Sequence, residues 1–211
     1  PGHLRIEVAA SAINRADLMQ RNGGYPPPPG ASPIMGLECS GTITELGEGV
    51  SSFAVGDEVC ALLAGGGYAE EVVVPAGQVL PVPEGVSVVD AAALPEVFAT
   101  AYLNLYMEAG LRPTEQVIIH AGASGVGTAA LQMLKHSNNP SFVTVGNQSK
   151  LDQCKALEPR RAPFVTTGRL CPPLRRGQNT VWTSYWIRWE GNICRITSQY
   201  WVSVVAWFSS D

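Results

Sequence analysis

The segment from Val117 to Gly127, VIIHAGASGVG, constrains the fold of this chain more than any other feature. A short apolar run leads into a turn of small residues, and the following residues 128–134 have a helix-forming composition. A strand, a glycine-rich turn and a helix are the parts of a dinucleotide-binding site, where glycines let the backbone approach a pyrophosphate and the helix N-terminus offers free N–H groups. The turn reads A-x-x-G-x-G instead of the full G-x-G-x-x-G, so a strand-to-helix connection without a ligand stays open as an alternative.

The surroundings of this turn favour the dinucleotide interpretation. Residues 141–145 read as a second strand, and the interval from Val117 to Gly146 has the length of a βαβ unit. NAD sites usually place an acidic residue at the end of the second strand, to accept a hydrogen bond from the ribose 2′-hydroxyl. Here that end lacks an acid and is followed by Lys150, which favours a 2′-phosphate and therefore NADP. A solvated lysine at the start of a helix is the alternative interpretation of Lys150.

The N-terminal part has the pattern of a small β protein. Residues 4–9, 41–47 and 68–74 read as strands, residues 55–62 as a turn followed by a strand, and residues 78–83 as a short edge segment. This pattern predicts a β-barrel over residues 1–85. Asn14 can cap a short helix that ends at Gln20. Residues 21–33 hold five prolines and three glycines, so they form a loop around Tyr25.

The period changes after residue 85. Asp90 can cap a short helix, Pro95 interrupts the helical pattern, and residues 97–109 read as a longer helix. Residues 86–157 are therefore expected to form a partial nucleotide-binding domain. From Glu158 onward the composition differs, with seven arginines, no lysine and all five tryptophans, which predicts an irregular, poorly folded tail over residues 158–211.

Composition limits the function classes. The longest apolar runs fall short of the roughly 20 residues that cross a membrane, and a net charge of −4 disfavours a nucleic-acid partner. The five cysteines are scattered without a C-x-x-C pair, which is typical of reduced thiols in a cytoplasmic protein. The chain begins directly in strand-like sequence without a methionine, so we expect it to lack a first strand.

Several segments together resemble one family. They are residues 12–18 (AINRADL), 36–41 (GLECSG), 47–50 with 55–59 (GEGV and VGDEV), 65–69 (GGGYA) and 121–127 (AGASGVG). In order and spacing they are similar to the quinone oxidoreductase branch of the medium-chain dehydrogenase/reductase superfamily, over about residues 3–157. The resemblance implies an α/β plus β fold, with a GroES-like β-barrel followed by a truncated Rossmann-type parallel sheet domain. It also implies NADPH as hydride donor and quinones as acceptors.

The resemblance also implies roles for individual residues. It places three side chains around the nicotinamide and the substrate: Asn14, Asp17 and Tyr25. It places eight residues on the cofactor: Thr100, Ser124, Gly125, Val126, Gly127, Gly146, Asn147 and Lys150. The alternatives are structural: Asn14 and Asp17 brace a helix, Tyr25 packs on its loop, and Thr100 bonds back into its own helix.

Zinc chemistry is the rival within the same architecture. Zinc alcohol dehydrogenases need a cysteine and a histidine from the barrel, and the matching positions here are Asn14 and Leu37. Glu38 remains but cannot hold a metal alone. We therefore expect no metal, and acceptors that take hydride readily, such as quinones or activated enones.

Beyond Leu157 the family pattern stops. An abrupt change to arginine, proline and tryptophan is typical of out-of-frame translation, so we hypothesise a splice or frameshift variant. Two functional hypotheses stay open: an NADPH-dependent quinone reductase, and an inactive or regulatory form with an incomplete nucleotide site. The homodimer of the family is in doubt, because the region that forms its dimer edge does not match.

Overall fold

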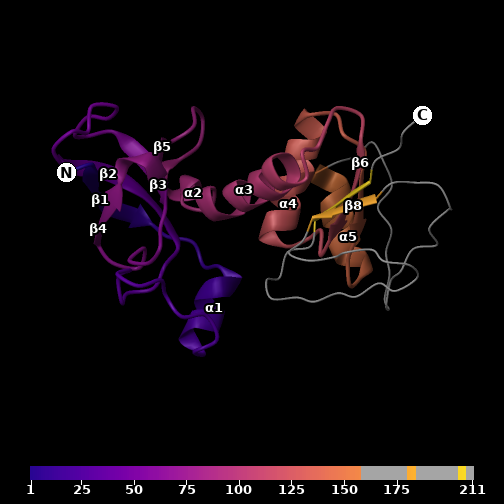
Figure 1. Cartoon of the computed structure of the whole chain (residues 1–211), viewed down its shortest axis with the longest axis horizontal. Coiled ribbons are helices and arrows are strands. Elements are labelled where there is room, and N and C mark those ends of the chain that lie inside the picture. Colours follow the sequence, from indigo (N-terminus) through magenta and orange to yellow (C-terminus); the bar gives the residue numbers. More distant parts are fainter. Residues whose placement is uncertain (158–179, 184–203, 208–211) are drawn as a thin grey trace. The chain divides into compact units, whose positions relative to one another are not determined.

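The computed structural model describes residues 1–157, 180–183 and 204–207 (Figure 1). The chain divides into two compact units, Pro1–Glu96 and Val97–Asp211. The first unit extends past residue 85, because the short helix α2 (Val88–Ala91) packs on the strands of the first sheet.

The first unit is built on an antiparallel five-stranded sheet with the order β4-β1-β2-β3-β5. Its strands are β1 (His3–Ala10), β2 (Glu38–Leu46), β3 (Glu58–Leu62), β4 (Glu71–Pro75) and β5 (Val79–Pro81). Two short helices accompany them, α1 (Arg15–Arg21) and the 3₁₀ turn η1 (Ala76–Gln78). Alternate residues of these strands face one apolar core, which includes Leu4, Ile6, Ile43, Val59 and Val74.

Two strands of this sheet, β2 and β4, begin three residues away from their predicted starts. β2 begins at Glu38 and not at Gly41, because Glu38, Cys39 and Ser40 continue the ladder with β3. β4 begins at Glu71 and not at Tyr68, because the chain before it turns at Gly65 and Gly66, both with positive φ.

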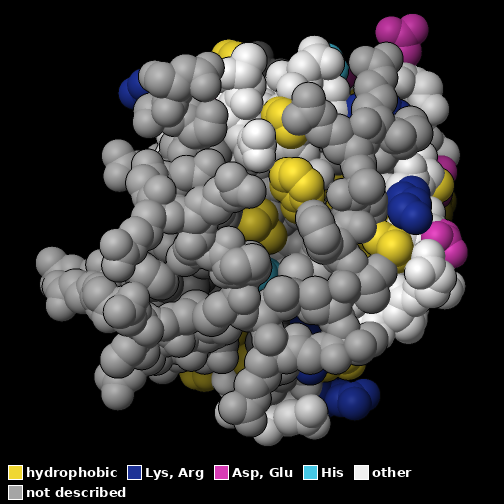
Figure 2. Space-filling view, turned by 90° about the vertical axis from the view of Figure 1, so that its right-hand side faces the viewer, with side chains coloured by type: hydrophobic (Ala, Val, Ile, Leu, Met, Phe, Trp, Pro, Cys, Tyr) yellow, Lys and Arg dark blue, Asp and Glu magenta, His cyan; other side chains and the backbone are white. Residues whose placement is uncertain are grey.

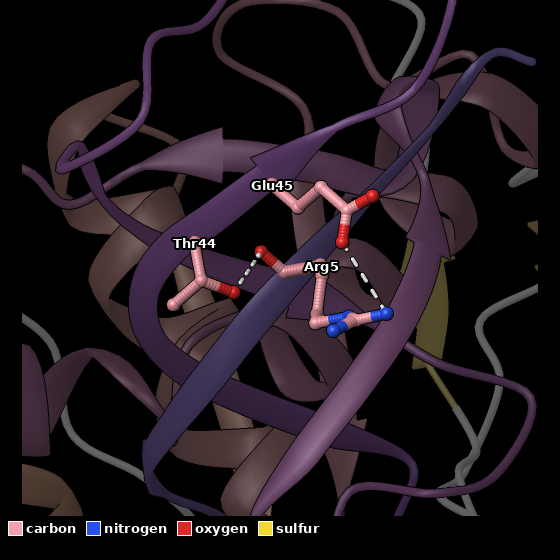
Figure 3. Close-up of polar contacts among 3 residues, drawn as sticks. All are labelled: Arg5, Thr44 and Glu45. Carbon is pink, nitrogen blue, oxygen red and sulfur yellow. Dashed lines mark hydrogen bonds and ion pairs between the residues drawn. The ribbon is translucent and has the colours of Figure 1, made fainter.

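The outer face of the sheet carries polar side chains. Arg5 of β1 and Glu45 of β2 form an ion pair with an N···O distance of 3.3 Å (Figure 3). The neighbouring Thr44 hydroxyl donates to the Arg5 carbonyl oxygen at 3.5 Å. The Glu45 side chain is 64% exposed, so this pair contributes little to stability.

Two predictions for the segment after the sheet were wrong. Ser87, and not Asp90, caps α2: its hydroxyl accepts a hydrogen bond from the backbone N–H of Asp90. Pro95 does not interrupt a helix but begins α3 (Pro95–Tyr102). Proline suits the first helical position, where its missing N–H has no intrahelical partner.

The second unit continues α3 and then alternates helix and strand. α3 passes into the π-helix η2 (Leu103–Glu108), so the predicted helix over 97–109 changes type in its middle. The following elements are β6 (Gln116–His120), α4 (Gly125–His136), β7 (Ser141–Thr144) and α5 (Gln148–Leu157). Their apolar faces share a core that includes Leu105, Val117, Ile119, Leu131 and Leu134.

The sheet of this unit has the order β7-β6-β9-β8. β6 and β7 are parallel, as a βαβ unit requires, whereas β9 (Val204–Trp207) is antiparallel to both β6 and β8 (Thr180–Thr183). In a Rossmann sheet the position beside the first strand, opposite the second, belongs to a parallel fourth strand. Among the described strands of this sheet, β6 and β7 are the one parallel pair, and the antiparallel β9 lies beside β6.

The irregular tail expected over residues 158–211 is not irregular throughout. β8 and β9 are strands, and their valines, threonines and tryptophans are residue types that favour strands. The remaining tail residues, including the other tryptophans, lie outside the described residues.

None of the described helices is long and apolar enough to cross a membrane. On the face shown in Figure 2, hydrophobic side chains of the described residues are visible near its centre.

Candidate functional site

The residues implied by the family resemblance fall into two sets, one in each unit. Asn14, Asp17 and Tyr25 belong to the first unit, and the eight cofactor positions belong to the second.

Asn14 lies at the N-cap of α1, where the chain leaves β1. Its backbone N–H donates to Asp17 Oδ2 at 2.7 Å, so the acid braces the first turn of the helix. Its side-chain amide nitrogen donates to Glu38 Oε1 at 2.7 Å. The alternative role of Asn14 and Asp17 in bracing a helix is therefore realised, and Asn14 has an additional buried partner.

Asp17 is buried and only partly satisfied. It is 2% exposed, and its Oδ1 has no hydrogen-bond partner among the described residues. An unsatisfied buried oxygen of this kind costs about 1–3 kcal/mol. The Tyr68 hydroxyl is the neighbouring donor group: burial and the Asp17 carboxylate raise the pKa of Tyr68 to about 12. At neutral pH Tyr68 is consequently a neutral hydrogen-bond donor beside a buried acid.

Glu38 is the functional candidate that the sequence analysis set aside. It is 1% exposed in β2 and accepts two hydrogen bonds, from Asn14 Nδ2 at 2.7 Å and from the backbone N–H of Glu96 at 2.8 Å. Burial raises the pKa of its carboxyl group, and the two hydrogen bonds oppose that rise. The signal in the sequence was a lone acid within an otherwise apolar or small strand segment, 37–41.

Glu96 completes a cluster of three carboxyl groups with Glu38 and Asp17. Burial raises the pKa of Glu96, and the charges of Glu38 and Asp17 raise it further. Among the described residues, no group of three or more His, Cys, Asp or Glu side chains has a geometry that could hold a metal ion.

Tyr25 lies in the proline-rich segment after α1 and is half-buried. Its place beside a substrate stays a prediction.

In the second unit, the small residues of the turn are required by packing. A β-carbon at Gly122 would lie 2.6 Å from Val143, and one at Gly127 would lie 2.6 Å from the Gly122 carbonyl oxygen. Gly122 and Gly127 therefore serve as the first and third glycines of a dinucleotide turn, for the tight turn and for close packing of helix on strand. Ala121 adopts a φ of 55°, a conformation that favours glycine.

Ser124 stands between these glycines and caps α4. Its hydroxyl oxygen accepts a hydrogen bond from the Gly127 N–H at 3.1 Å, and its carbonyl accepts from the Thr128 N–H at 2.8 Å. The N–H groups of Gly125 and Val126 precede that first helical bond, so they belong to the open first turn. Gly125 is exposed, and a β-carbon there would meet only Val97, at 3.1 Å. This geometry leaves a helix start at which an anion can approach the backbone.

The second cofactor segment lies at the same sheet edge. β6 and β7 run parallel in register from Val117 opposite Ser141 to His120 opposite Thr144, so both strands end together. The Gly122 N–H donates to the Thr144 carbonyl at 3.0 Å, which ties the two loops to each other. Ligands of open α/β sheets bind outside these carboxyl ends.

Three residues follow β7, and all are exposed: Gly146, Asn147 and Lys150. Asn147 Oδ1 accepts a hydrogen bond from the Lys150 backbone N–H at 2.9 Å, so Asn147 caps α5 and Lys150 lies in its first turn. Lys150 therefore lies where the alternative interpretation placed it, at the exposed start of a helix. Its exposed amine is free to contact a phosphate at the same time.

Thr100 is half-buried on α3, and its carbonyl oxygen accepts a hydrogen bond from Asn104 Nδ2 at 2.7 Å. This bond spans the point at which α3 passes into η2. A nicotinamide contact by Thr100 stays a prediction.

Comparison with known proteins identifies the family. Residues 1–84 match the alcohol dehydrogenase GroES-like domain. The synaptic vesicle membrane protein VAT-1 homologue of Danio rerio is 40% identical over 149 residues, which cover 71% of this chain and 31% of that protein.

Two solved structures are similar to the chain at the level of the fold. The quinone oxidoreductase of Escherichia coli in complex with NADPH has a TM-score of 0.67 at 31% identity, covering 78% of this chain and 49% of the enzyme. The CurK enoyl reductase has a TM-score of 0.68 at 32% identity, covering 79% and 52%. The chain thus spans about a third of the curated relative and about half of each enzyme.

The chain belongs to the medium-chain dehydrogenase/reductase superfamily of oxidoreductases, in its quinone-oxidoreductase-like branch. Its fold class follows: a GroES-like domain precedes part of a Rossmann-type domain.

Proposed function

We propose that this chain derives from a zinc-independent, NADPH-dependent quinone oxidoreductase that transfers a hydride to a quinone. The observation that carries the proposal is the turn between β6 and α4, where Gly122 and Gly127 permit tight packing, Gly125 is exposed, and the N–H groups of Gly125 and Val126 stay open. The NADPH complex of the similar Escherichia coli quinone oxidoreductase supports the same cofactor class.

The choice of NADPH over NADH rests on the end of β7. Residues 145–151, which follow this strand, hold no acid to accept from a ribose 2′-hydroxyl, and the exposed Lys150 amine favours a 2′-phosphate. NADPH, when bound, supplies the hydride. The roles proposed for the chain itself are to bind the pyrophosphate through residues 124–127, to orient the nicotinamide beside Thr100, and to bind the acceptor through Asn14, Asp17 and Tyr25.

A second candidate function is that of an inactive or regulatory form. The observation that favours it is the sheet of the second unit, in which one parallel pair is followed by an antiparallel strand. Such a form keeps the first unit and the pyrophosphate turn but turns over no quinone.

NADPH fluorescence titration combined with turnover of a simple ortho-quinone separates the two. Binding with turnover supports the reductase, and binding without turnover supports the regulatory form. Absence of NADPH binding contradicts the proposed cofactor site. The acceptor class is tested in parallel with an activated enone, since an enoyl reductase is among the similar structures.

The Lys150 amine gives a sharper test of cofactor choice. Lys150→Ala is expected to weaken NADPH binding about five- to tenfold, because a charge-assisted hydrogen bond to the 2′-phosphate is lost, and to leave NADH binding unchanged. Lys155→Ala is the matched control, since Lys155 is also exposed on α5 but lies near its other end. An equal loss of affinity for NADPH and NADH would show that Lys150 does not bind the 2′-phosphate.

A further inference from the structure

Glu38 connects two segments far apart in the sequence. One carboxylate oxygen accepts from the side-chain amide of Asn14, and the other accepts from the backbone N–H of Glu96, in the first turn of α3. Asn14 precedes α1, and α3 is the helix that carries Thr100. A single buried side chain thus holds one proposed substrate residue and the start of the helix with a proposed cofactor residue.

The first bond fixes the orientation of the Asn14 amide. Its nitrogen must face Glu38, because a flipped amide would set its oxygen against a carboxylate oxygen. Asn14 Oδ1 and the second Nδ2 hydrogen are then directed elsewhere, one as acceptor and one as donor.

The second bond secures the start of α3. The first N–H groups of a helix have no intrahelical partner, and Pro95 contributes none. The Glu38 carboxylate accepts the N–H of the next residue, Glu96, and its negative charge is favourable at a helix N-terminus. A carboxylate from a distant strand therefore acts as the cap of this helix.

We propose that Glu38 is a positioning residue for the proposed reaction, acting by orienting Asn14 and anchoring α3 through one buried carboxylate. The roles of Asn14 and Thr100 in this statement rest on the proposed function; the anchoring itself does not.

Amide hydrogen exchange tests the anchoring without any activity. In the unmodified chain, the Glu96 N–H is expected to exchange slowly, although first-turn amides ordinarily exchange quickly. Glu38→Gln, which keeps the side-chain volume but replaces one acceptor by a donor, is expected to speed this exchange at least about tenfold. Rapid exchange at Glu96 in the unmodified chain would overturn the proposal even if the variant fails to fold.

Kinetics test the positioning. Glu38→Gln is expected to lower kcat for the quinone about 10- to 100-fold, because a hydrogen bond to a charged group is lost, and to change the Kd for NADPH less than about twofold. The double variant Asn14→Ala with Glu38→Gln is expected to lose less activity than the two single losses combined, since part of the effect of Glu38 passes through Asn14. If the activity losses of the two single variants simply add in the double variant, Glu38 does not act through Asn14.

Glu45→Gln is the matched control: it alters a glutamate on the same strand whose side chain is 64% exposed in a surface ion pair. It is expected to leave Glu96 exchange and turnover unchanged. If the unmodified chain shows no turnover, the proposed function fails, and exchange at Glu96 still decides the anchoring. Unchanged exchange and unchanged kcat in Glu38→Gln would overturn the proposal.

Discussion

At the scale of single residues, some buried carboxylate oxygens have hydrogen-bond partners and others do not. Glu38 is buried with both carboxylate oxygens paired, whereas Asp17 beside it keeps one oxygen without a partner in the described part of the chain. Ala121 occupies a left-handed conformation at the start of the dinucleotide turn. Glycine would adopt the backbone conformation of Ala121 more readily, and an apolar side chain in place of Asp17 would leave no buried oxygen unpaired. Both positions therefore carry a free-energy cost that other interactions must offset.

Ala121→Gly is expected to raise the free energy of unfolding by about 0.5–1 kcal/mol, because glycine adopts a φ of 55° without steric strain. Urea denaturation followed by circular dichroism measures the change. Ala123→Gly, in the same turn but without a positive φ, is the control and is expected to give no gain. Equal stabilisation by both variants would show that the strain at Ala121 is not the cause.

At the scale of elements, α4 and its preceding turn combine a helix cap with the proposed pyrophosphate site. The Ser124 hydroxyl closes the cap by accepting from Gly127, and the two N–H groups between them stay available. The cap and the proposed pyrophosphate site therefore depend on the same residue in different ways, and a substitution can separate them.

Ser124→Asp is expected to keep the stability of α4 within about 0.5 kcal/mol, because aspartate caps helices as well as serine does. The same variant is expected to weaken NADPH binding at least about tenfold, since a carboxylate would repel the pyrophosphate. Ser124→Ala should instead cost about 1 kcal/mol of stability. Thermal unfolding and cofactor titration of the same samples measure both quantities, and unchanged NADPH binding in Ser124→Asp would exclude the pyrophosphate from this helix start.

Local patterns predicted most elements but not how their ends are secured. Strands β1, β6 and β7 followed from residue alternation and apolar runs, and the dinucleotide turn followed from its small residues. The early start of β2 did not, because it depends on pairing with β3. The role of Glu38 did not either, because its partners Asn14 and Glu96 are distant in the sequence. Pro95 was misread since proline both ends and begins helices, and only the surrounding chain decides which.

At the scale of the whole molecule, the chain combines a GroES-like unit with part of a Rossmann-type unit, in which β9 lies antiparallel beside β6. The matched part of the chain covers 31% of the curated relative and 49% of the quinone oxidoreductase. The free energy of unfolding should depend on pH through ionisable groups in both units, because each unit buries at least one such group.

The pH dependence of stability follows from these groups. Burial lowers the pKa of His120, whose Nδ1 lies 3.0 Å from Thr144 Oγ1. Below pH 6.5 the unfolded chain therefore takes up this proton before the folded chain does, so stability falls as the pH drops from 6.5 toward the lowered pKa. His120→Gln is expected to flatten this part of the curve in chemical denaturation between pH 5 and 7.

His3→Gln, at an exposed position of β1, is the control and should leave the curve of stability against pH unchanged. A curve of the same slope in His120→Gln and in the unmodified chain would contradict the assignment to His120.

Glu38 and Glu96 have the opposite effect on the pH dependence of stability. Their raised pKa values make stability fall as the pH rises above 4.5 toward those values.

Fluorescence titration of the full chain with NADPH, set against NADH under the same conditions, tests the central claim most directly. If residues 124–127 and Lys150 form a cofactor site, NADPH binds saturably and more tightly than NADH. Ser124→Asp then weakens the binding of both cofactors, and Lys150→Ala abolishes the preference by weakening NADPH binding alone. If NADPH fails to bind at millimolar concentration, or binds no better than NADH, the turn reflects the ancestry of the chain and not a working nucleotide site.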